Sequence, residues 1–344
     1  MTDVPLDVRV SLLRQHGAFS QAYSATFQPG LQRFGDERGF LAYKMVGKTA
    51  LALSDPLAPS EYRKDLLVRF IREKRDVCFW QVSRPIAEIL ASQGFFINEM
   101  GTETRLDLAN YNFAGRKKRT LRLAFNRMMK LGYVTVERPA ASLNAQELRA
   151  VSESWRQTRT FREVEVAFLN RPPVLGDEPD VRKFYTFDHD GKLLAFGFFD
   201  PVYEKGHVAG YLYSIKRRLP KADILAGYAI LHRAIESFKE EGRRWLFLGL
   251  SPFAGIADKE FPRNWLIMHF FRFAYWNPLI NRFVFPFQGH AQHKREFYGT
   301  AKQTYYAFNR RPSLPRVLKV LWACDLIYPE VAPSAIERVA RPAP

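Results

Sequence analysis

Two regions of the chain carry a similar order of predicted secondary-structure elements, and this order constrains the fold more than any other feature. Apolar runs of strand length bounded by turn residues predict strands, and apolar residues three and four positions apart predict helices. In the first half these patterns predict strands at 39–46 and 49–53, a helix at 60–73 and a strand at 77–82. A short helix from Pro85 to before Gly94 and further strands at 95–98 and 103–108 are expected to follow. In the second half they predict strands at 182–187, 193–199 and 207–215, a helix at 223–240 and a strand at 245–250.

An order of hairpin, strand, loop, helix, strand, helix and strand is typical of acyltransferases of the N-acetyltransferase (GNAT) type. We therefore predict an α/β fold with mixed sheets, built from two tandem GNAT-like domains. The first domain is expected at residues 1–138 and the second, catalytic one at 139–310. Residues 311–344 are expected to form a basic amphipathic tail.

The composition favours a soluble protein with polyanionic partners. The chain has 344 residues and is 47% hydrophobic, which is enough for two ordinary cores. Its formal net charge of +17 favours nucleic acid, anionic lipid or acidic small molecules. No signal peptide and no run of about 20 residues free of charges and helix breakers is present. With only Cys78 and Cys324, far apart, a reducing compartment is expected. We therefore predict a cytoplasmic protein, either free or peripheral to the inner face of the plasma membrane.

The strongest local signal is a basic helix at 115–130. Seven Lys or Arg residues lie between Arg116 and Lys130, and no acid occurs from 108 to 136. On a helical wheel the apolar side chains Leu121, Ala124, Phe125, Met128 and Leu131 share one face. The polar side chains that we expect to bind phosphate are Arg116, Lys118, Arg119, Arg122, Asn126 and Lys130. Such a row suits a tRNA backbone or anionic headgroups equally well, or is a solvated basic face.

A series of short motifs, all in the same order, resembles the catalytic domain of phosphatidylglycerol lysyltransferases, the aminoacyl-tRNA-dependent aminoacyl-lipid synthases. The likeness covers about residues 35 to 308. Its motifs include Ser54-Asp-Pro56, Phe79-Trp-Gln-Val-Ser83, Gly101-Thr-Glu103, Gly115-Arg116, Leu248-Gly-Leu-Ser-Pro-Phe253, Gln288-Gly289 and Lys294-Arg-Glu-Phe297. The resemblance implies a tandem GNAT-like fold and transfer of an amino acid from tRNA to a lipid hydroxyl.

The chain departs from the family pattern at two places. Thr102 replaces the first of two acids that follow the glycine matched by Gly101. The segment 213–218 lacks the acid of the family's acidic-apolar-arginine motif. These differences leave the transferred amino acid, lysine or another, and the acceptor open.

Cationic residues after the 207–215 strand mark the place where a GNAT fold has its phosphate-binding loop. Lys216, Arg217 and Arg218 follow this strand, and no glycine occurs until Gly227. Acetyl-CoA users need a glycine-rich loop there because backbone amides bind the pyrophosphate. The sequence therefore argues against acetyl-CoA, and the three side chains are expected to meet phosphates of tRNA or phospholipid, or to be solvated. Asp223 either caps the next helix or binds the cationic α-amino group of the aminoacyl moiety.

Four further residues complete the candidate site. In the resembling family the cationic motif at Lys294 lies by the active site, so we expect this lysine to contact a phosphate or oxyanion. Glu103 lines the same cleft or pairs with nearby arginines. Gly249 and Ser251 lie where a strand ends in a turn, which permits close approach of substrate or reflects packing alone. The catalytic set is thus Asp223, Lys294 and Arg217, with Lys216 and Arg218 binding substrate and Glu103, Gly249 and Ser251 lining its pocket.

No cofactor and no metal are expected. His290 and His293 have a spacing that binds metal on a helix, but no third ligand stands out. The aromatic segment 265–287, with interleaved arginines, lines an acyl-chain tunnel, docks at a bilayer interface or belongs to the core. The oligomeric state stays open.

The leading functional hypothesis is an aminoacyltransferase that takes an amino acid from aminoacyl-tRNA to a lipid such as phosphatidylglycerol. The expected partners are aminoacyl-tRNA and an anionic phospholipid or membrane surface. Three alternatives remain at this stage. They are tRNA-dependent transfer to a peptidoglycan precursor or small amine, an acyl-CoA-dependent GNAT N-acyltransferase, and a non-catalytic RNA-binding protein.

Overall fold

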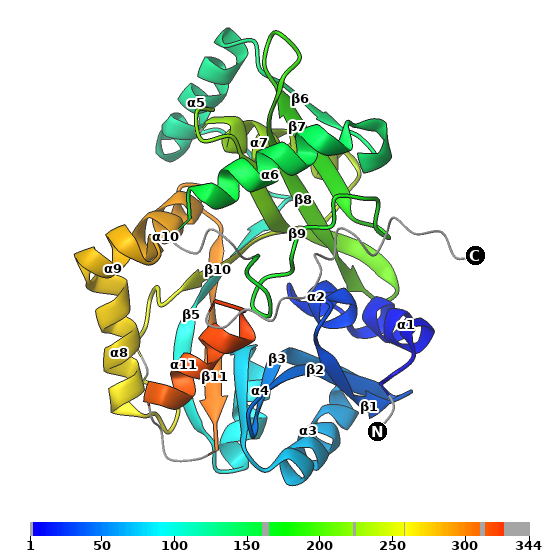
Figure 1. Cartoon of the computed structure of the whole chain (residues 1–344), viewed down its shortest axis with the longest axis vertical. Helices are drawn as coiled ribbons and strands as arrows, with labels where there is room; N and C mark the ends of the chain where they lie inside the picture. Colours follow the sequence, from blue (N-terminus) through cyan, green and yellow to red (C-terminus); the bar gives the residue numbers. More distant parts are fainter. Residues whose placement is uncertain (1–2, 160–164, 223–224, 258, 310–313, 327–344) are drawn as a thin grey trace.

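The described residues form one mixed sheet of eleven strands that is covered by helices on both faces (Figure 1). The computed structural model describes residues 3–159, 165–222, 225–257, 259–309 and 314–326. Its strands are β1 Gln32–Asp36, β2 Gly39–Val46, β3 Thr49–Leu57, β4 Val77–Val82, β5 Phe96–Asp107, β6 Val134–Glu137, β7 Arg182–Phe187, β8 Leu193–Glu204, β9 His207–Arg218, β10 Trp245–Pro252 and β11 Thr300–Phe308. Its α-helices are α1 Leu6–His16, α2 Ala22–Phe27, α3 Ser60–Lys74, α4 Arg84–Ser92, α5 Arg119–Lys130, α6 Ala145–Gln157, α7 Leu225–Glu240, α8 Trp265–Trp276, α9 Pro278–Phe283, α10 Phe287–Arg295 and α11 Leu314–Ala323.

The strand order is β1-β2-β3-β4-β11-β5-β10-β9-β8-β7-β6. Towards each end of the sheet an antiparallel hairpin is followed by a parallel pair, β3 with β4 and β9 with β10. At the centre β11 is antiparallel to both β4 and β5. The mixed α/β class is therefore confirmed. Because β11 lies between β4 and β5, both predicted units share one sheet, and the division into two tandem domains stays a prediction.

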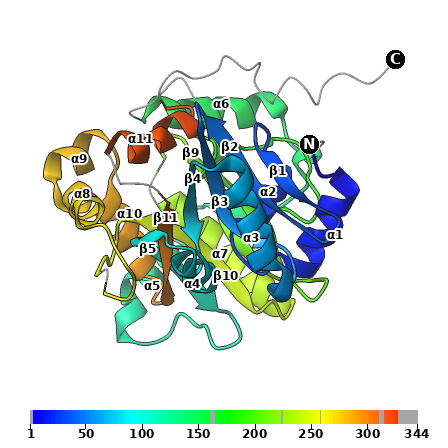
Figure 2. The ribbon, with the colours of Figure 1, turned by 90° about the horizontal axis from the view of Figure 1, so that it is seen from below.

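Helices cover the two faces of the sheet in separate groups (Figure 2). On the first half, α3 and α4 enclose one core with Phe70 and Phe79 at its centre. The opposite face packs against α1, α2, α8 and α11. On the second half, α7 packs on one face and α6 on the other. α1 also contacts β8, so apolar packing joins the two halves of the sheet.

Three boundaries predicted from the sequence were wrong. Ser54-Asp-Pro56 does not end its strand, because Ser54 adopts a φ of 59° and β3 continues to Leu57. The two strands predicted at 95–98 and 103–108 are one strand, β5, in which Gly101 has a φ of 141° and the register with β11 shifts between Glu99 and Gly101. A Cβ there would lie 2.3 Å from the Ser251 carbonyl oxygen, so only glycine fits this approach of β5 to β10. The strand predicted at 207–215 is longer than expected, because β9 extends to Arg218. Lys216, Arg217 and Arg218 therefore lie in the sheet and not in a loop.

The basic helix has the predicted amphipathic character. Leu121, Ala124, Phe125 and Met128 of α5 are buried, and the helix packs against α7. Leu131 was predicted on the same face but is 40% exposed, because the helix ends at Lys130.

Candidate active site

The pairing of the two parallel strands β9 and β10 ends part-way along their length. Gly210–Leu212 pairs with Trp245–Phe247, and beyond these residues both strands continue. At this point β10 bulges, since its register with β5 shifts between Phe247 and Gly249, which has a φ of 80°. Helix α10 packs against β10 here. Strands β9 and β10 and helix α10 together carry most residues of the candidate site.

Two lysines define the site, Lys294 with a buried side chain and Lys216 with a half-buried one. Lys216 of β9 donates to the Leu248 carbonyl oxygen at 3.5 Å, and Lys294 of α10 donates to the Leu250 carbonyl oxygen. Lys294 is only 2% exposed. Burial lowers the pKa of Lys216 to about 8. The pKa of Lys294 is also lowered, first by burial and then by the charge of Lys216, while Glu103 acts in the opposite direction.

Glu103 is the acid that faces these lysines. It lies on β5 opposite Leu250, and its neighbours across the site include Ser20, which hydrogen-bonds to it. Burial raises the pKa of Glu103 despite that hydrogen bond and the charge of Lys294. Its Oε1 atom is buried and finds no hydrogen-bond partner in the part of the chain that the structure describes. One incompletely bonded acid therefore faces Lys294, which in turn lies beside a second cation, Lys216.

Two histidines of α10 share this environment and stay neutral. Burial, followed by the charge of Lys294, lowers the pKa of His290 to about 2. Burial, followed by the charge of Lys216, lowers the pKa of His293 to about 4. The His293 Nδ1 atom lies 3.1 Å from the Tyr228 hydroxyl, which donates to Glu296 at 2.6 Å. Because that hydroxyl proton is used, Nδ1 carries the imidazole proton and Nε2 is left as an acceptor.

This arrangement suits an anionic group. A buried cation without a matched carboxylate is unfavourable unless it loses its proton or gains an anionic partner. A phosphate or the oxyanion of a tetrahedral intermediate would supply the missing negative charge. Across the described segments no three His, Cys, Asp or Glu side chains gather closely enough to hold a metal ion.

The two histidines predict a loss of stability in acid. Their folded-state pKa values lie below the ordinary 6.5, so between these values the unfolded chain binds more protons than the folded chain. Stability is complete above about pH 6.5 and falls as the pH drops. We expect His293→Asn to reduce the difference in unfolding free energy between pH 7 and pH 5 by about 2 kcal/mol, measured by urea denaturation. The exposed His189→Asn should leave this difference unchanged, and equal changes for both variants would refute the assignment.

The structure brings some predicted site residues together and separates others. Lys216, Lys294, Glu103 and Gly249 gather at the site, and a Cβ added to Gly249 would lie 3.8 Å from Lys294 Nζ. Ser251 is buried further along β10, opposite Thr102.

Arg217 points to the opposite face of β9, because successive side chains of a strand alternate. Its guanidinium lies 3.8 Å from the Trp155 ring centroid and donates to Glu165 at 2.7 Å. Arg218 donates to the Ala222 carbonyl oxygen at 2.8 Å. Asp223 lies outside the described residues. Of the three predicted catalytic residues, the structure thus places only Lys294 at this site.

The basic helix presents four of its six predicted phosphate ligands to solvent. Arg116, Arg119, Asn126 and Lys130 are exposed. Arg122 instead donates to the carbonyl oxygens of Phe113 and Gly115 at 2.8 and 2.7 Å, and Lys118 donates to that of Asn112. These two side chains therefore hydrogen-bond to the loop that precedes the helix. In both ribbon views α5 and α8 lie on the same side of the molecule, with α10 between them (Figures 1 and 2).

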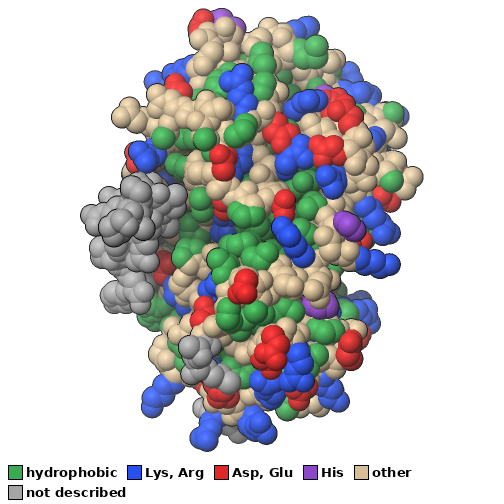
Figure 3. Space-filling view, turned by 90° about the vertical axis from the view of Figure 1, so that its right-hand side faces the viewer, with side chains coloured by type: hydrophobic (Ala, Val, Ile, Leu, Met, Phe, Trp, Pro, Cys, Tyr) green, Lys and Arg blue, Asp and Glu red, His purple; other side chains and the backbone are tan. Residues whose placement is uncertain are grey.

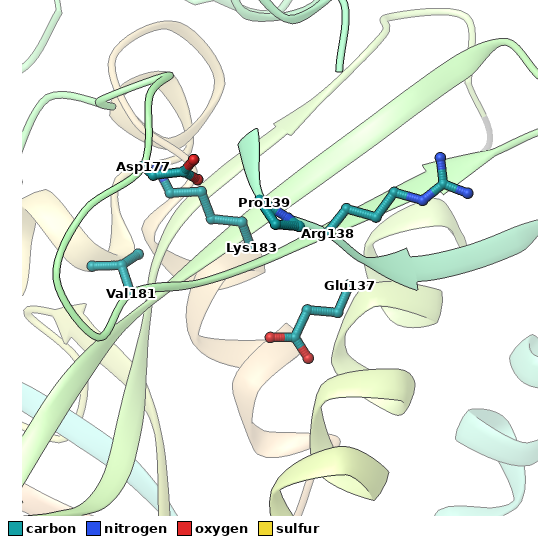
Figure 4. Close-up of a pocket in the computed structure, with 6 residues that line it drawn as sticks. All are labelled: Glu137, Arg138, Pro139, Asp177, Val181 and Lys183. Atoms are coloured by element: carbon teal, nitrogen blue, oxygen red, sulfur yellow. The ribbon is translucent and has the colours of Figure 1, made fainter. Parts of the chain in front are cut away.

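A separate hollow of about 390 Å³ lies beside β6 and β7 (Figure 4). Its walls include Glu137, Asp177 and Lys183. Each of these charges is already bonded within the chain: Lys183 to Glu178 at 3.1 Å, Asp177 to the Ala140 amide at 2.7 Å, and Glu137 to Arg182. Because its polar groups are bonded within the chain, we do not assign a ligand to this hollow.

Sequence reasoning missed the bonded set of His293, Tyr228 and Glu296. Tyr228 lies on α7. His293 lies on α10 and Glu296 directly after it, 65 and 68 positions along the chain from Tyr228. The spacing of His290 and His293 was visible in the sequence, but it suggested metal binding and not a neutral pair beside two lysines.

Comparison with known proteins places this chain in a family. The family described as phosphatidylglycerol lysyltransferase, C-terminal, matches residues 9–308. Phosphatidylglycerol lysyltransferases from Bacillus subtilis and Staphylococcus epidermidis are 24% and 22% identical over 81% and 88% of the chain. The structure of L-PGS from Bacillus licheniformis superposes with a TM-score of 0.73 at 18% identity, covering 92% of this chain and 96% of that one.

The chain therefore belongs to the phosphatidylglycerol lysyltransferase C-terminal family. It spans about a third of the length of these curated relatives, with 32% and 36% of their sequences aligned. The resemblance read from the sequence motifs is thereby confirmed.

Proposed function

We propose that this chain is an aminoacyltransferase that moves an amino acid, lysine or another, from aminoacyl-tRNA to a lipid hydroxyl, as in phosphatidylglycerol, on the cytoplasmic face of the membrane. The observation that carries the proposal is a pair of neighbouring lysines, the buried Lys294 and the half-buried Lys216, in a chain of this family. An aminoacyl ester is already activated. The protein has to align the two substrates, stabilise an oxyanion and assist proton transfer.

The proposed reaction exchanges one ester for another. The lipid hydroxyl oxygen attacks the carbonyl carbon of the aminoacyl ester and forms a tetrahedral oxyanion. Collapse of this intermediate breaks the bond to the ribose oxygen and leaves the amino acid on the lipid. The hydroxyl proton of the lipid ends on the departing ribose oxygen, so charge and atoms balance. Lys216 and Lys294 supply positive charge where the oxyanion or a neighbouring phosphate lies.

His293 is our candidate for the group that handles the proton. Its Nε2 atom accepts, because the Nδ1 proton is held by Tyr228 and through it by Glu296. An anion on the two lysines would offset the positive charges that help to lower the pKa of His293. Its basicity would then rise when substrate is bound, which is when general-base assistance is needed.

The basic helix α5 fits the tRNA side of the proposal. Its exposed cations would neutralise backbone phosphates and release counterions, which strengthens binding without reading base sequence. Helix α10 lies between α5 and the aromatic helices α8 and α9 (Figures 1 and 2). The site thus has a polyanion-binding element on one side and an apolar surface on the other.

Transfer from acyl-CoA is the main alternative, and one observation disfavours it. The segment where a glycine-rich pyrophosphate loop is expected begins with Lys216–Arg218, and these residues are strand β9. Their backbone groups pair with Ala195, Phe196 and Gly197 of β8. The residues that follow them contain no glycine before Gly227, so the segment lacks the glycine-rich loop whose amides would bind a pyrophosphate.

Purified protein should transfer radiolabelled amino acid from charged tRNA into a chloroform-soluble product when vesicles contain phosphatidylglycerol. The assay compares several charged tRNAs, because the sequence leaves the amino acid open. Vesicles without phosphatidylglycerol, soluble amines and acyl-CoA form parallel arms. Labelled lipid in the first arm supports the proposal. If folded protein yields no labelled lipid from any charged tRNA but acylates an amine, the lipid acceptor is wrong.

A further inference from the structure

Helices α8 and α9 and the residues that follow them expose an unusual amount of apolar surface. Eight of the eighteen large hydrophobic side chains exposed in the described part of the chain lie here. We call them the aromatic face: Trp265, Leu266, Phe273, Trp276, Leu279, Phe283, Val284 and Phe285. Trp265, Trp276 and Leu279 are 66%, 67% and 64% exposed. Exposed large apolar side chains concentrated in one short segment indicate an interaction site.

The aromatic face is a second apolar side of α8, separate from the side that anchors it. Ile267, Phe271 and Ala274 are buried against the body of the protein. Trp265, Phe273 and Trp276 occupy the outer side, at helical spacing. Asn264 caps the helix by accepting from the Ile267 amide at 3.1 Å, and Asn277 caps α9 in the same way. Two capped helices therefore hold the outer side chains in place without burying them.

Charge identifies the kind of partner. No Asp or Glu occurs between Glu260 and Glu296. Arg263, Arg272 and Arg282 are exposed along the same segment, and within the described residues they form no ion pair. By contrast, acids and bases intermingle on the opposite side of the molecule (Figure 3). Arginine among exposed Trp and Phe matches the interface of an anionic bilayer, where headgroups take the cations and aromatic rings lie at headgroup depth.

The same charge pattern disfavours a second copy of this chain as the partner. A symmetric dimer through the aromatic face would bring arginines against arginines, with no acid on either side to pair with them. None of the helices in the described residues is long and apolar enough to cross a bilayer. The surface would therefore lie in the interface plane, which is how amphipathic helices with basic and aromatic residues bind.

We propose that the aromatic face docks the protein on an anionic bilayer, with Trp265, Trp276 and Leu279 inserted at headgroup depth. This docking rests on the proposed function, because it names the surface that would meet the membrane containing the acceptor lipid. Helix α10 follows directly after α9 and carries Lys294. Docking would therefore set the candidate site beside the lipid headgroups from which an acceptor must come.

Vesicle flotation without tRNA tests this docking separately from catalysis. Vesicles contain either equal parts of phosphatidylglycerol and phosphatidylcholine, or phosphatidylcholine alone. We expect binding to the anionic vesicles, and a reduction of at least about tenfold for Trp276→Ser/Leu279→Ser, since each side chain loses its apolar burial. Arg272→Ser should weaken binding about fivefold at low salt. The control is Leu6→Ser, which removes a side chain that is 52% exposed on α1.

A second readout distinguishes insertion from adsorption through the basic helix α5. Brominated lipids should quench tryptophan fluorescence in the unmodified chain, and Trp276→Ser should reduce the quenching. Equal binding of the double variant and Leu6→Ser would overturn the proposal. So would a double variant that binds vesicles normally but changes from dimer to monomer. Loss of vesicle binding with normal transfer to a detergent-dispersed lipid would confirm the docking surface and leave the proposed chemistry intact.

Discussion

Lys294→Met should lower kcat/KM for aminoacyl transfer by at least about 100-fold, the effect of removing one oxyanion-stabilising donor. Methionine keeps most of the side-chain volume and removes the charge. Because Lys294 is 2% exposed and its pKa is lowered by burial and by Lys216, its charge destabilises the unliganded protein. The variant should therefore unfold at the same or a higher urea concentration than the unmodified chain. A large loss of activity combined with retained stability separates a chemical role from a structural one.

The kinetic parameters tell which anion Lys294 meets. If it stabilises the oxyanion, kcat falls and KM stays unchanged, because that charge exists only in the transition state. If it holds a substrate phosphate, KM rises instead. Lys216→Met should give a similar loss, and the double variant should fall less than the product of the two, because both lysines act on one anion. Lys64→Ala, at an exposed position of α3, is the matched control. Full activity in Lys294→Met would exclude this lysine from the reaction.

Local patterns were sufficient to predict much of the secondary structure. The helix α3 and the strands β2 and β4 were expected almost at their observed bounds, because their apolar spacing and turn residues are clear. The helical spacing of the apolar residues in α5 also predicted which face of this helix is buried. Short elements such as β1 and β6 were missed, since a few half-buried residues give no distinct period.

The central part of the fold depends on contacts that local sequence does not encode. Placing β11 between β4 and β5 joins residues 195 to 230 positions apart. The candidate site depends on the same kind of contact. Lys294 was expected from its motif, but its position beside Lys216 follows from packing of α10 on β10. Arg217 was expected beside them, and the extension of β9 turned it towards Trp155.

A buried network of charged side chains is expected to contribute strongly to the stability of the fold. Arg171 contacts Asp200 at 2.7 Å and Glu178 at 2.5 Å, and Glu178 also contacts Lys183 at 3.1 Å. The side chains of Arg171 and Asp200 are each 2% exposed. Asp200 also accepts from Ser214 of β9 at 2.9 Å. These contacts tie the segment before β7 to strands β7, β8 and β9.

Arg171→Met should therefore lower the unfolding free energy by about 3 to 5 kcal/mol, because Asp200 is left buried without its cation. The double variant Arg171→Met/Asp200→Asn should recover much of this loss, since the uncompensated charge is then gone while the amide can still accept from Ser214. Arg84→Ala breaks an exposed pair with Glu88 and should cost less than about 1 kcal/mol. Urea denaturation at pH 7 gives all three values. A loss for Arg171→Met no larger than that for Arg84→Ala would show that the network is not what holds this segment on the sheet.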